Sequence, residues 1–284
     1  MEHSFVLLAG DARLRALLHL LEEKGISALH LTACRSPAAL EAAVAIAKTL
    51  VLPVPMSRDD VHLSSSGEEC ILLEDVLGAL QPGQEVFGGA ISADQKAKIE
   101  ARGAKAVDFL RDAPFVLKNA AFTAQGALRL LLEQLNVPLQ GLPVLVTGYG
   151  RVGKATGTLL RSVGCRVSVA ARSEVQRTEA ALSGCAAITL DAMPAILPRT
   201  AAILNTAPAP LFDAGTLRRC QKDALYLELA SAPFGAQETE VRAAGLHYVF
   251  GGGLPGRFCA AGCADAMLQV MKGKCPLLSP MCET

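Results

Sequence analysis

The sequence contains no tryptophan and few other aromatic residues. Its 284 residues include three Tyr and nine Phe, so aromatic side chains make up 4% of the chain. Proteins that bind single-stranded nucleic acids stack bases on such side chains. The basic excess typical of nucleic-acid-binding proteins is also missing, because 27 Lys and Arg are balanced by 27 Asp and Glu. We therefore expect no nucleic-acid partner.

The sequence also lacks a long hydrophobic run, although 51% of its residues are hydrophobic. No apolar segment reaches about 18 residues, the length that a membrane-spanning helix requires. The apolar stretch near the N-terminus, residues 5–10, is too short for the hydrophobic region of a signal peptide. We expect a cytoplasmic protein without membrane association. The chain length and hydrophobic content suit two α/β domains, each with its own core.

Recognisable metal-binding and nucleophilic motifs are missing as well. The nine cysteines show no C-x-x-C spacing, and their odd number is typical of free thiols in a reducing compartment; they stand at positions 34, 70, 165, 185, 220, 259, 263, 275 and 282. Cys259 and Cys263 would share one face of a helix, but no second Cys or His pair accompanies them. The five histidines, at 3, 19, 30, 62 and 247, are dispersed. We expect no metal site and identify no catalytic residue.

Short apolar runs alternate with amphipathic segments along the whole chain. This pattern predicts strands in the first part at 5–10, 28–32, 49–54, 85–90 and 105–110. It predicts six more at 144–148, 166–171, 186–190, 201–205, 224–229 and 246–250. Helices are expected at 12–24 and at about 115–135, with an amphipathic C-terminal helix from 263 to 274. The polar, turn-rich segment 55–69 is expected to be an exposed loop.

This alternation predicts an α/β fold of two doubly wound domains, the second a Rossmann-type NADP-binding domain, with a cleft between them. The predicted domains are 1–116, a flavodoxin-like or Rossmann-like domain for the substrate, and 117–258, a dinucleotide-binding domain entered through a linker helix. Residues 259–284 are predicted to form a helix that packs back on the first domain.

The segment `GYGRVG`, residues 148–153, has the G-x-G-x-x-G spacing of a dinucleotide-binding loop. Gly148 allows the tight turn after a strand, Gly150 lets the backbone approach a pyrophosphate, and Gly153 lets the next helix pack closely on the sheet. A predicted strand precedes the loop and a predicted helix follows it, which is the context that this motif requires. Tyr149, Arg151 and Val152 complete the predicted phosphate-binding segment. The alternative is a glycine turn selected only for packing.

The next strand ends without the acid that usually binds the adenosine ribose of NAD. Arg172 stands 19 residues after Gly153, where that acid is expected, between Ala171 and Ser173. A guanidinium group at this place can bind a 2′-phosphate through two hydrogen bonds, and Ser173 can donate another. These residues predict NADP as the cofactor. The alternative is a solvated surface arginine.

Further candidates follow the later strands of the second domain. The segment `LNTAP` ends one strand and `LASAP` and `GGGLPG` end the next two, all at the same edge of a parallel sheet. We assign Asn205, Thr206 and Pro208 to the nicotinamide half of the cofactor. The other predicted cofactor-binding residues of these segments are Ala207, Leu229, Ala230 and Gly253. Ordinary turns are the alternative for these glycine-rich segments. In the first domain, Asp11 and Arg13 follow the first strand and Arg111 follows the last.

Taken together, these segments resemble the A subunit of bacterial dipicolinate synthase over nearly the whole chain. The resemblance lies in `GDAR` (10–13), `LVLPV` (50–54), `RD` (111–112), Asn119, Gly126, `GYGRVG`, `ARS` (171–173), `LNTAP`, `LASAP` and `GLPG` (253–256), in this order. Each segment alone is only weakly specific for the family. Their combined order and spacing are more specific. The chain departs from the family at Gln125, where an acid is common, and in `RFCAAGCAD` after `GLPG`. The layout is more distantly similar to 2-hydroxyacid dehydrogenases and adenosylhomocysteinase.

The resemblance implies NADP-dependent oxidation of dihydrodipicolinate to dipicolinate in the mother cell during sporulation. It also implies a flavoprotein-like partner, the B subunit, and we expect a homo-oligomer. The two substrate carboxylates require cationic partners, for which Arg13, Arg111 and Arg257 are the candidates, with Lys118 behind them. The other predicted substrate-binding residues are Asp11, Pro53, Asn119, Thr123, Leu254 and Pro255.

Two alternatives remain open at this point. The chain could be an NADP-dependent 2-hydroxyacid-type dehydrogenase or reductase, although such enzymes pair a His with a carboxylate and no His stands near 255–265. It could also be an NADP-binding protein that is inactive without its partner.

Overall fold

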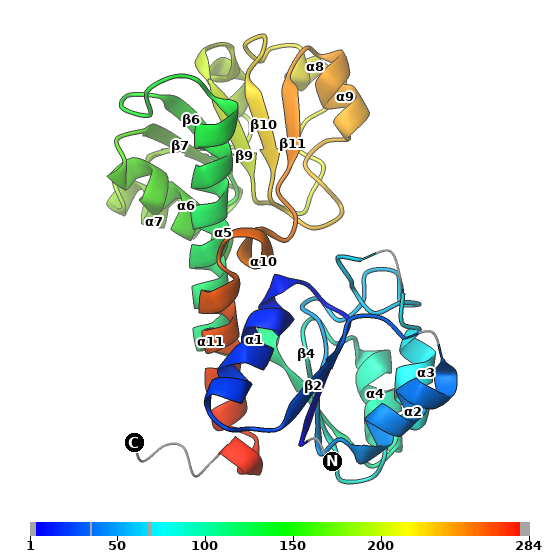
Figure 1. The fold of residues 1–284 in the computed structure, drawn as a ribbon. Coiled ribbons are helices and arrows are strands. Elements are labelled where there is room, and N and C mark those ends of the chain that lie inside the picture. The colour runs from blue at the N-terminus through cyan, green and yellow to red at the C-terminus, as the bar shows by residue number, and fades with distance from the viewer. Residues whose placement is uncertain (1–3, 35, 68–69, 279–284) are drawn as a thin grey trace. The chain divides into compact units, whose positions relative to one another are not determined.

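The computed structural model describes residues 4–34, 36–67 and 70–278, so His3 and Cys282 lie outside the described residues. The chain divides into two compact units. Unit 1 comprises residues 1–118 and 259–284, and unit 2 comprises residues 119–258. Their elements are labelled in Figure 1.

Unit 1 contains a five-stranded parallel sheet with the order β2-β1-β3-β4-β5. Its strands are β1 (Phe5–Leu8), β2 (Ala28–Leu31), β3 (Thr49–Val51), β4 (Glu85–Gly88) and β5 (Lys105–Asp108). Its helices are α1 (Ala12–Glu23), α2 (Pro37–Ile46), α3 (Leu73–Ala79), α4 (Ala93–Ala101), the 3-10 turn η1 (Phe109–Arg111) and α11 (Ala260–Lys272). This strand order is the flavodoxin-like form of a doubly wound sheet.

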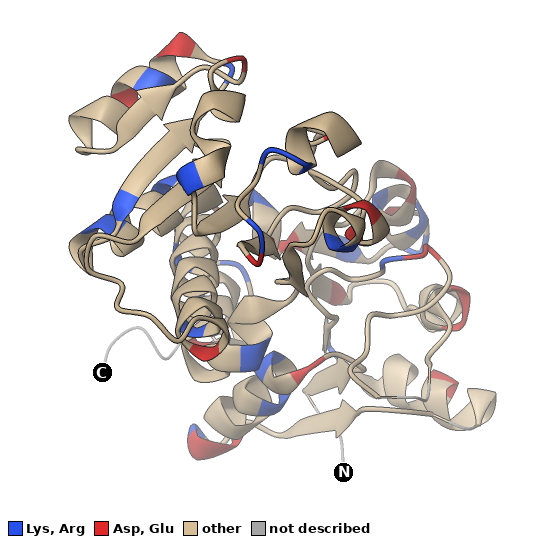
Figure 2. Cartoon of the chain, turned by 90° about the horizontal axis from the view of Figure 1, so that it is seen from above, with Lys and Arg blue, Asp and Glu red and all other residues tan. Residues whose placement is uncertain are grey.

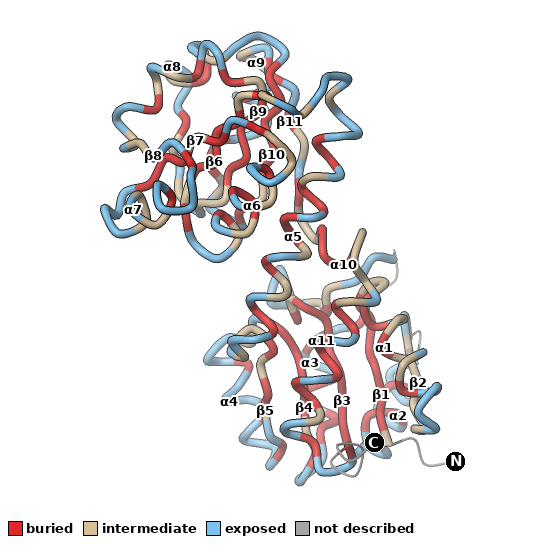
Figure 3. Tube along the Cα trace, turned by 90° about the vertical axis from the view of Figure 1, so that its left-hand side faces the viewer, coloured by how far each residue is buried: buried red, intermediate tan, exposed pale blue. Residues whose placement is uncertain are grey.

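The alternating side chains of the unit 1 strands produce two cores. Phe5 and Leu7 of β1 face α1 and α11, which bury Leu14, Leu17 and Met267 on that side. Val6 and Leu8 face the opposite side, where α2 and α3 cover the sheet. Because both faces are covered, the central strands are buried, as the red strands of Figure 3 show.

Unit 2 contains a six-stranded parallel sheet with the order β11-β10-β9-β6-β7-β8. Its strands are β6 (Pro143–Thr147), β7 (Arg166–Ala170), β8 (Ala186–Ile188), β9 (Ala202–Asn205), β10 (Leu225–Glu228) and β11 (His247–Phe250). Its helices are α6 (Arg151–Ser162), α7 (Glu174–Leu182), α8 (Ala214–Leu217), α9 (Glu238–Ala243) and α10 (Leu254–Phe258). This is the Rossmann strand order, two mononucleotide-binding halves that meet at β6 and β9.

The long helix α5 (Ala113–Gln134) begins in unit 1 and continues into unit 2. In unit 2 its residues Ala127, Leu130 and Leu131 pack with the strands. A Cβ atom on Gly126 would lie 2.7 Å from Cβ of Leu254, so glycine at this position allows α10 to approach α5.

The structure confirms the predicted fold class, two doubly wound α/β units. The expected helices appear as α1, α5 and α11. One connection differs from the expected helical pattern, because β8 and β9 are joined by the 3-10 turns η2 (Met193–Ala195) and η3 (Leu197–Arg199). Each turn contains a proline, Pro194 and Pro198, and a proline in the interior of an α-helix removes a backbone hydrogen bond.

Within the described ranges, no helix has the length and hydropathy to cross a membrane. The same residues contain no cluster of three or more His, Cys, Asp and Glu side chains that could hold a metal ion.

Candidate functional site

In unit 2 the strand order reverses between β6 and β9, which are hydrogen-bonded neighbours with Thr147 opposite Asn205. Chain segments that leave two such strands diverge to opposite faces of the sheet and open a crevice at their carboxyl ends. The glycine loop follows β6 at this point, and the segment 205–208 follows β9. Thr206 joins them, because its hydroxyl donates to the carbonyl oxygen of Thr147 at 2.8 Å.

The three glycines of the loop have different surroundings. Gly148 has a φ of +82°, which favours glycine. A Cβ on Gly153 would lie 2.3 Å from the Gly148 carbonyl oxygen, so the close contact of α6 with the loop requires glycine. A Cβ on Gly150 would meet no heavy atom within 4 Å. Gly150 is also the N-cap of the 12-residue helix α6, without a side-chain cap. The backbone amides at the N-terminus of α6 are therefore available to an anion that lies against the loop. A pyrophosphate group fits this arrangement.

This difference predicts opposite results for two alanine variants. Gly153→Ala should destabilise unit 2 by about 2–4 kcal/mol, because its methyl group overlaps a backbone carbonyl. Gly150→Ala should leave the free energy of unfolding within about 0.5–1 kcal/mol of wild type but weaken dinucleotide binding, because its methyl group enters the space of the pyrophosphate. Urea unfolding and calorimetric titration measure the two effects. Equal loss of stability in both variants would contradict the assignment.

The end of β7 presents two arginines. Arg172 is exposed, and Ser173 is the N-cap of α7, where its hydroxyl oxygen accepts from the Gln176 amide at 3.5 Å. Nη1 of Arg177 donates to the carbonyl oxygens of Ala171 at 2.9 Å and Arg172 at 2.6 Å. Sequence reasoning missed Arg177, although its place in the first turns of the helix after Arg172 was a usable signal. The Arg177 guanidinium thus fixes the backbone at residues 171 and 172, from which the Arg172 side chain extends.

A buried polar network connects the carboxyl ends of three neighbouring strands. Thr147, Asn205 and Glu228 lie side by side in the sheet register and are all completely buried. The Thr147 hydroxyl donates to Oδ1 of Asn205 at 2.6 Å, and Nδ2 of Asn205 donates to Oε1 of Glu228 at 2.6 Å. Burial raises the pKa of Glu228, although hydrogen bonds from Asn205, Gly235 and Ala230 act in the opposite direction. Neither Thr147 nor Glu228 lies in a sequence motif that predicts a role for it.

The other predicted cofactor residues differ in accessibility. The Tyr149 side chain is 1% exposed and packs in the core beside Gly157, so only its backbone is available to a ligand. Asn205 and Ala230 are buried, whereas Arg151 and Pro208 are exposed. Partial exposure is found for Val152, Thr206, Ala207, Leu229 and Gly253. All of these residues belong to unit 2 and lie at or near the carboxyl ends of its strands.

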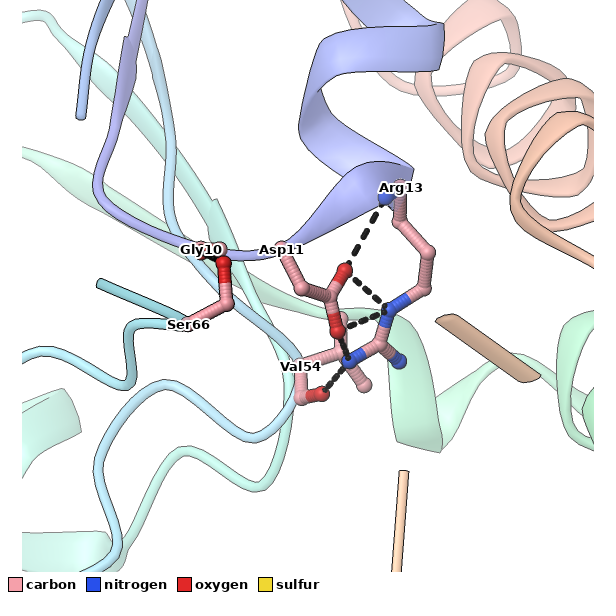
Figure 4. Close-up of polar contacts among 5 residues, drawn as sticks. All are labelled: Gly10, Asp11, Arg13, Val54 and Ser66. Carbon is pink, nitrogen blue, oxygen red and sulfur yellow. Dashed lines mark hydrogen bonds and ion pairs between the residues drawn. The ribbon is translucent and has the colours of Figure 1, made fainter. Parts of the chain in front are cut away.

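Unit 1 has its own reversal point, between β1 and β3. Figure 4 shows the Asp11 carboxylate beside the Arg13 guanidinium there. Oδ1 of Asp11 accepts from Nε of Arg13 at 2.9 Å, and Oδ2 accepts from Nη2 at 2.7 Å. Nη2 also donates to the carbonyl oxygen of Val54, which follows β3. The pair thus connects the ends of the two central strands.

Arg13 is a buried cation with a carboxylate partner. The Arg13 and Asp11 side chains are 8% and 29% exposed. Burial tends to raise the pKa of Asp11, but hydrogen bonds from Arg13 and its positive charge outweigh burial, so the pKa lies below its ordinary value. Among the described residues, Nη1 of Arg13 has no hydrogen-bond partner, whereas Nε and Nη2 are both bonded.

The remaining substrate candidates fall into two groups. Arg111 and Arg257 are at least partly exposed, and Arg257 lies over the Phe258 ring at 4.9 Å from its centroid. Pro53, Leu254 and Pro255 are buried, and the Leu254 side chain belongs to the unit 2 core.

Two polar candidates lie on α5. The Thr123 hydroxyl donates to the Asn119 carbonyl oxygen at 2.8 Å, inside the helix. Oδ1 of Asn119 is buried and has no hydrogen-bond partner among the described residues. In unit 1, at the start of the same helix, Nζ of Lys118 donates to Oε1 of Gln269 at 2.5 Å.

Charged residues of both signs are distributed over each unit. In Figure 2 blue and red segments are interspersed along the helices of both units. This agrees with the equal numbers of basic and acidic residues in the chain.

Comparison with known proteins identifies the relatives of this chain. Residues 4–110 match the family model of the N-terminal domain of the dipicolinate synthase A subunit. The dipicolinate synthase A subunit of Bacillus subtilis (strain 168) is 24% identical over 210 residues, which cover 73% of this chain and 71% of that protein. The chain is thus similar to the dipicolinate synthase A subunit. The resemblance inferred from the sequence is therefore confirmed.

Two solved structures have a fold similar to that of this chain. The crystal structure of the dipicolinate synthase A subunit from Bacillus halodurans superposes with a TM-score of 0.83 at 18% identity, covering 98% of each chain. The apo-structure of D-lactate dehydrogenase from Escherichia coli superposes with a TM-score of 0.60 at 11% identity, covering 95% of this chain and 98% of that chain. Both a dipicolinate synthase A subunit and a D-lactate dehydrogenase therefore have this fold.

Proposed function

We propose that unit 2 binds NADP(H) and that the chain is an oxidoreductase of the dipicolinate synthase type. One observation carries the proposal. The glycine loop leaves space for an anion beside Gly150, and the strand after it ends in an arginine where NAD-binding proteins have an acid. Arg172 would bind the 2′-phosphate, and Arg177 would hold its backbone in place. The amides at the start of α6 would bind the pyrophosphate.

The proposed reaction is the oxidation of dihydrodipicolinate to dipicolinate. NADP⁺ bound in unit 2 would accept a hydride from the ring, and a proton would be released to solvent or to a base. Because the ring becomes aromatic, orientation and exclusion of water contribute more than a strong base. The His–carboxylate pairs among the described residues, His62 with Asp59 at 2.8 Å and His19 with Glu23 at 3.2 Å, lie in unit 1 with exposed side chains, and the proposal gives them no role. The cationic groups of this chain would bind and orient the two carboxylates of the substrate.

Arg111 and Arg13 are the proposed carboxylate-binding residues of unit 1. Arg111 is exposed, and no hydrogen bond or ion pair of its guanidinium is found among residues 4–34, 36–67 and 70–278. We expect Arg111→Ala to raise the substrate KM about tenfold, the value of one charge-assisted hydrogen bond, at unchanged cofactor affinity and stability.

Arg102→Ala is a matched control for this variant, because Arg102 is exposed at the C-terminal end of α4 and therefore at the opposite edge of the sheet. Steady-state kinetics of both variants measure the effect. An Arg111→Ala KM equal to that of Arg102→Ala would remove Arg111 from the site.

The proteins similar to this chain are named as A subunits. This supports a further part of the proposal, that a B subunit binds this chain. We propose that this flavoprotein-like partner assembles with the chain, itself a homo-oligomer, in the mother cell of a sporulating bacterium. Assay of the purified chain with and without the partner tests this point. Equal rates under both conditions would show that the chain needs no partner.

The cofactor assignment is tested by calorimetric titration of the wild-type chain with NADP⁺ and with NAD⁺. We expect NADP⁺ to bind at least about tenfold more tightly, because only NADP⁺ carries the phosphate that a guanidinium recognises. Tighter binding of NAD⁺ would overturn the assignment.

A further inference from the structure

The Glu228 carboxylate holds both ends of the loop that follows β10. Oε1 of Glu228 accepts from the Ala230 amide at 3.0 Å, and Oε2 accepts from the Gly235 amide at 2.9 Å. The loop, residues 229–236, is thereby closed around one buried side chain. A Cβ on Gly235 would lie 2.4 Å from Oη of Tyr226, so the loop lies directly on the side chains of the network.

Asn205 extends this arrangement to the segment 205–208. Its Nδ2 donates to Oε1 of Glu228 at 2.6 Å and to the Ala207 carbonyl oxygen at 3.1 Å. Its Oδ1 accepts from the Ala207 amide at 3.3 Å, in addition to the Thr147 hydroxyl. The segments after β9 and β10 therefore depend on one continuous network.

We infer that Glu228 is a positioning residue, which holds the segments 205–208 and 229–236 as the surface that binds the nicotinamide half of the dinucleotide. This inference rests on the proposed function. Arg172 places the adenosine half beyond β7, on one side of β6 in the sheet, whereas β9 and β10 lie on the other side. A dinucleotide whose pyrophosphate lies on the glycine loop therefore extends its second half over these two segments.

The chemistry of the contacts requires a carboxylate at position 228. All three short contacts of Glu228 come from N–H donors, the Asn205 amide group and the Ala230 and Gly235 backbone amides. A glutamine would direct its own N–H groups at one of these donors, because an amide has only one acceptor oxygen. Glu228→Gln therefore keeps the shape of the side chain but breaks the hold on one end of the loop.

The test compares two ligands on the full-length chain by calorimetric titration. NADP⁺ contains both halves, whereas adenosine 2′,5′-bisphosphate contains only the adenosine half. We expect Glu228→Gln to weaken NADP⁺ binding about tenfold, the value of a lost charge-assisted hydrogen bond, and to leave the affinity for the bisphosphate within about twofold.

Glu240→Gln serves as the control. Glu240 is exposed on α9 of unit 2 and makes none of the hydrogen bonds of the network, so we expect wild-type affinity for both ligands. If Glu228→Gln does not fold, Thr147→Val removes one hydrogen bond to Asn205 at nearly constant volume. It should weaken NADP⁺ binding in the same selective way, by a smaller factor.

The outcomes separate this inference from the proposed function. If wild-type chain binds neither ligand, the NADP(H) proposal fails, and the inference fails with it. If wild-type chain binds both, an equal loss for both ligands or no loss in Glu228→Gln overturns only the positioning role.

Discussion

Arg172→Asp is expected to reverse the cofactor preference of the chain. Removing the guanidinium removes a charge-assisted contact worth about 1.5–3 kcal/mol, and the new carboxylate repels the 2′-phosphate and can accept from a ribose 2′-hydroxyl. We therefore expect the ratio of NADP⁺ to NAD⁺ affinity to fall on the order of a thousandfold. Titration of the variant with both cofactors measures this ratio. Stability should be unchanged, because Arg172 is exposed.

Two variants show whether this effect belongs to position 172. Arg219→Asp is the charge-matched control, since Arg219 is exposed in the connection from α8 to the amino end of β10, away from the loop edge. It should bind both cofactors as wild type does. Arg177→Ala should weaken NADP⁺ binding less than Arg172→Ala, because Arg177 acts through the backbone of residues 171 and 172. An unaltered NADP⁺ preference in Arg172→Asp would contradict the assignment.

Arg13→Ala is expected to destabilise unit 1 by about 2–3 kcal/mol. Breaking a buried ion pair leaves its partner charge unpaired, which costs about 3–5 kcal/mol when both groups are fully buried. The lower value is expected here, because the Asp11 side chain is 29% exposed. The variant also loses the contact with the Val54 carbonyl oxygen that connects the ends of β1 and β3. Urea denaturation, with hydrogen exchange of the α1 amides, measures the loss.

Removing both members of the pair provides the control. Asp11→Ala combined with Arg13→Ala should cost less than the sum of the two single changes, since neither charge is then left unpaired. Arg15→Ala, an exposed change on the same helix, should lie within about 0.5 kcal/mol of wild type. If the double variant loses as much stability as the two single variants together, the two side chains do not stabilise the fold as a pair.

The same pair predicts a dependence of stability on pH. Because the Asp11 pKa is lowered in the folded chain, its contribution is fully present above the ordinary carboxyl pKa of about 4 and is lost as the pH falls through the lowered pKa. The double variant should therefore lose less stability than wild type on acidification below about pH 4. Identical acid profiles would contradict this role of Asp11.

The sequence predicted those features that depend on local pattern. The strands before and after the glycine loop follow from runs of β-branched and apolar residues, such as `VLVT` and `RVSVA`, and the loop itself follows from glycine spacing. Arg172 was predictable because the distance from the last glycine to the end of the next strand varies little in this fold. Each of these signals lies within about 30 residues of chain.

Features that depend on distant contacts were not predictable in the same way. Glu228 appears in the sequence as one acid at the end of an apolar run, and its role depends on Asn205, 23 residues earlier, and on a loop that folds back to it. Leu254 shows the opposite case, since its burial depends on α5, more than a hundred residues earlier. Arg13 could be placed at a strand end, but its ion pair with Asp11 and its contact with Val54 required the fold.

The most direct test of the proposed function follows two absorbances in one reaction. Freshly prepared dihydrodipicolinate is mixed with the purified chain, with and without the B-type partner, and with NADP⁺ or NAD⁺. We predict that dipicolinate and NADPH form in equal amounts and that NAD⁺ supports a much lower rate at the same concentration. Dipicolinate formation that is independent of either cofactor, or no formation in any combination while NADP⁺ binds, would contradict the proposed oxidation.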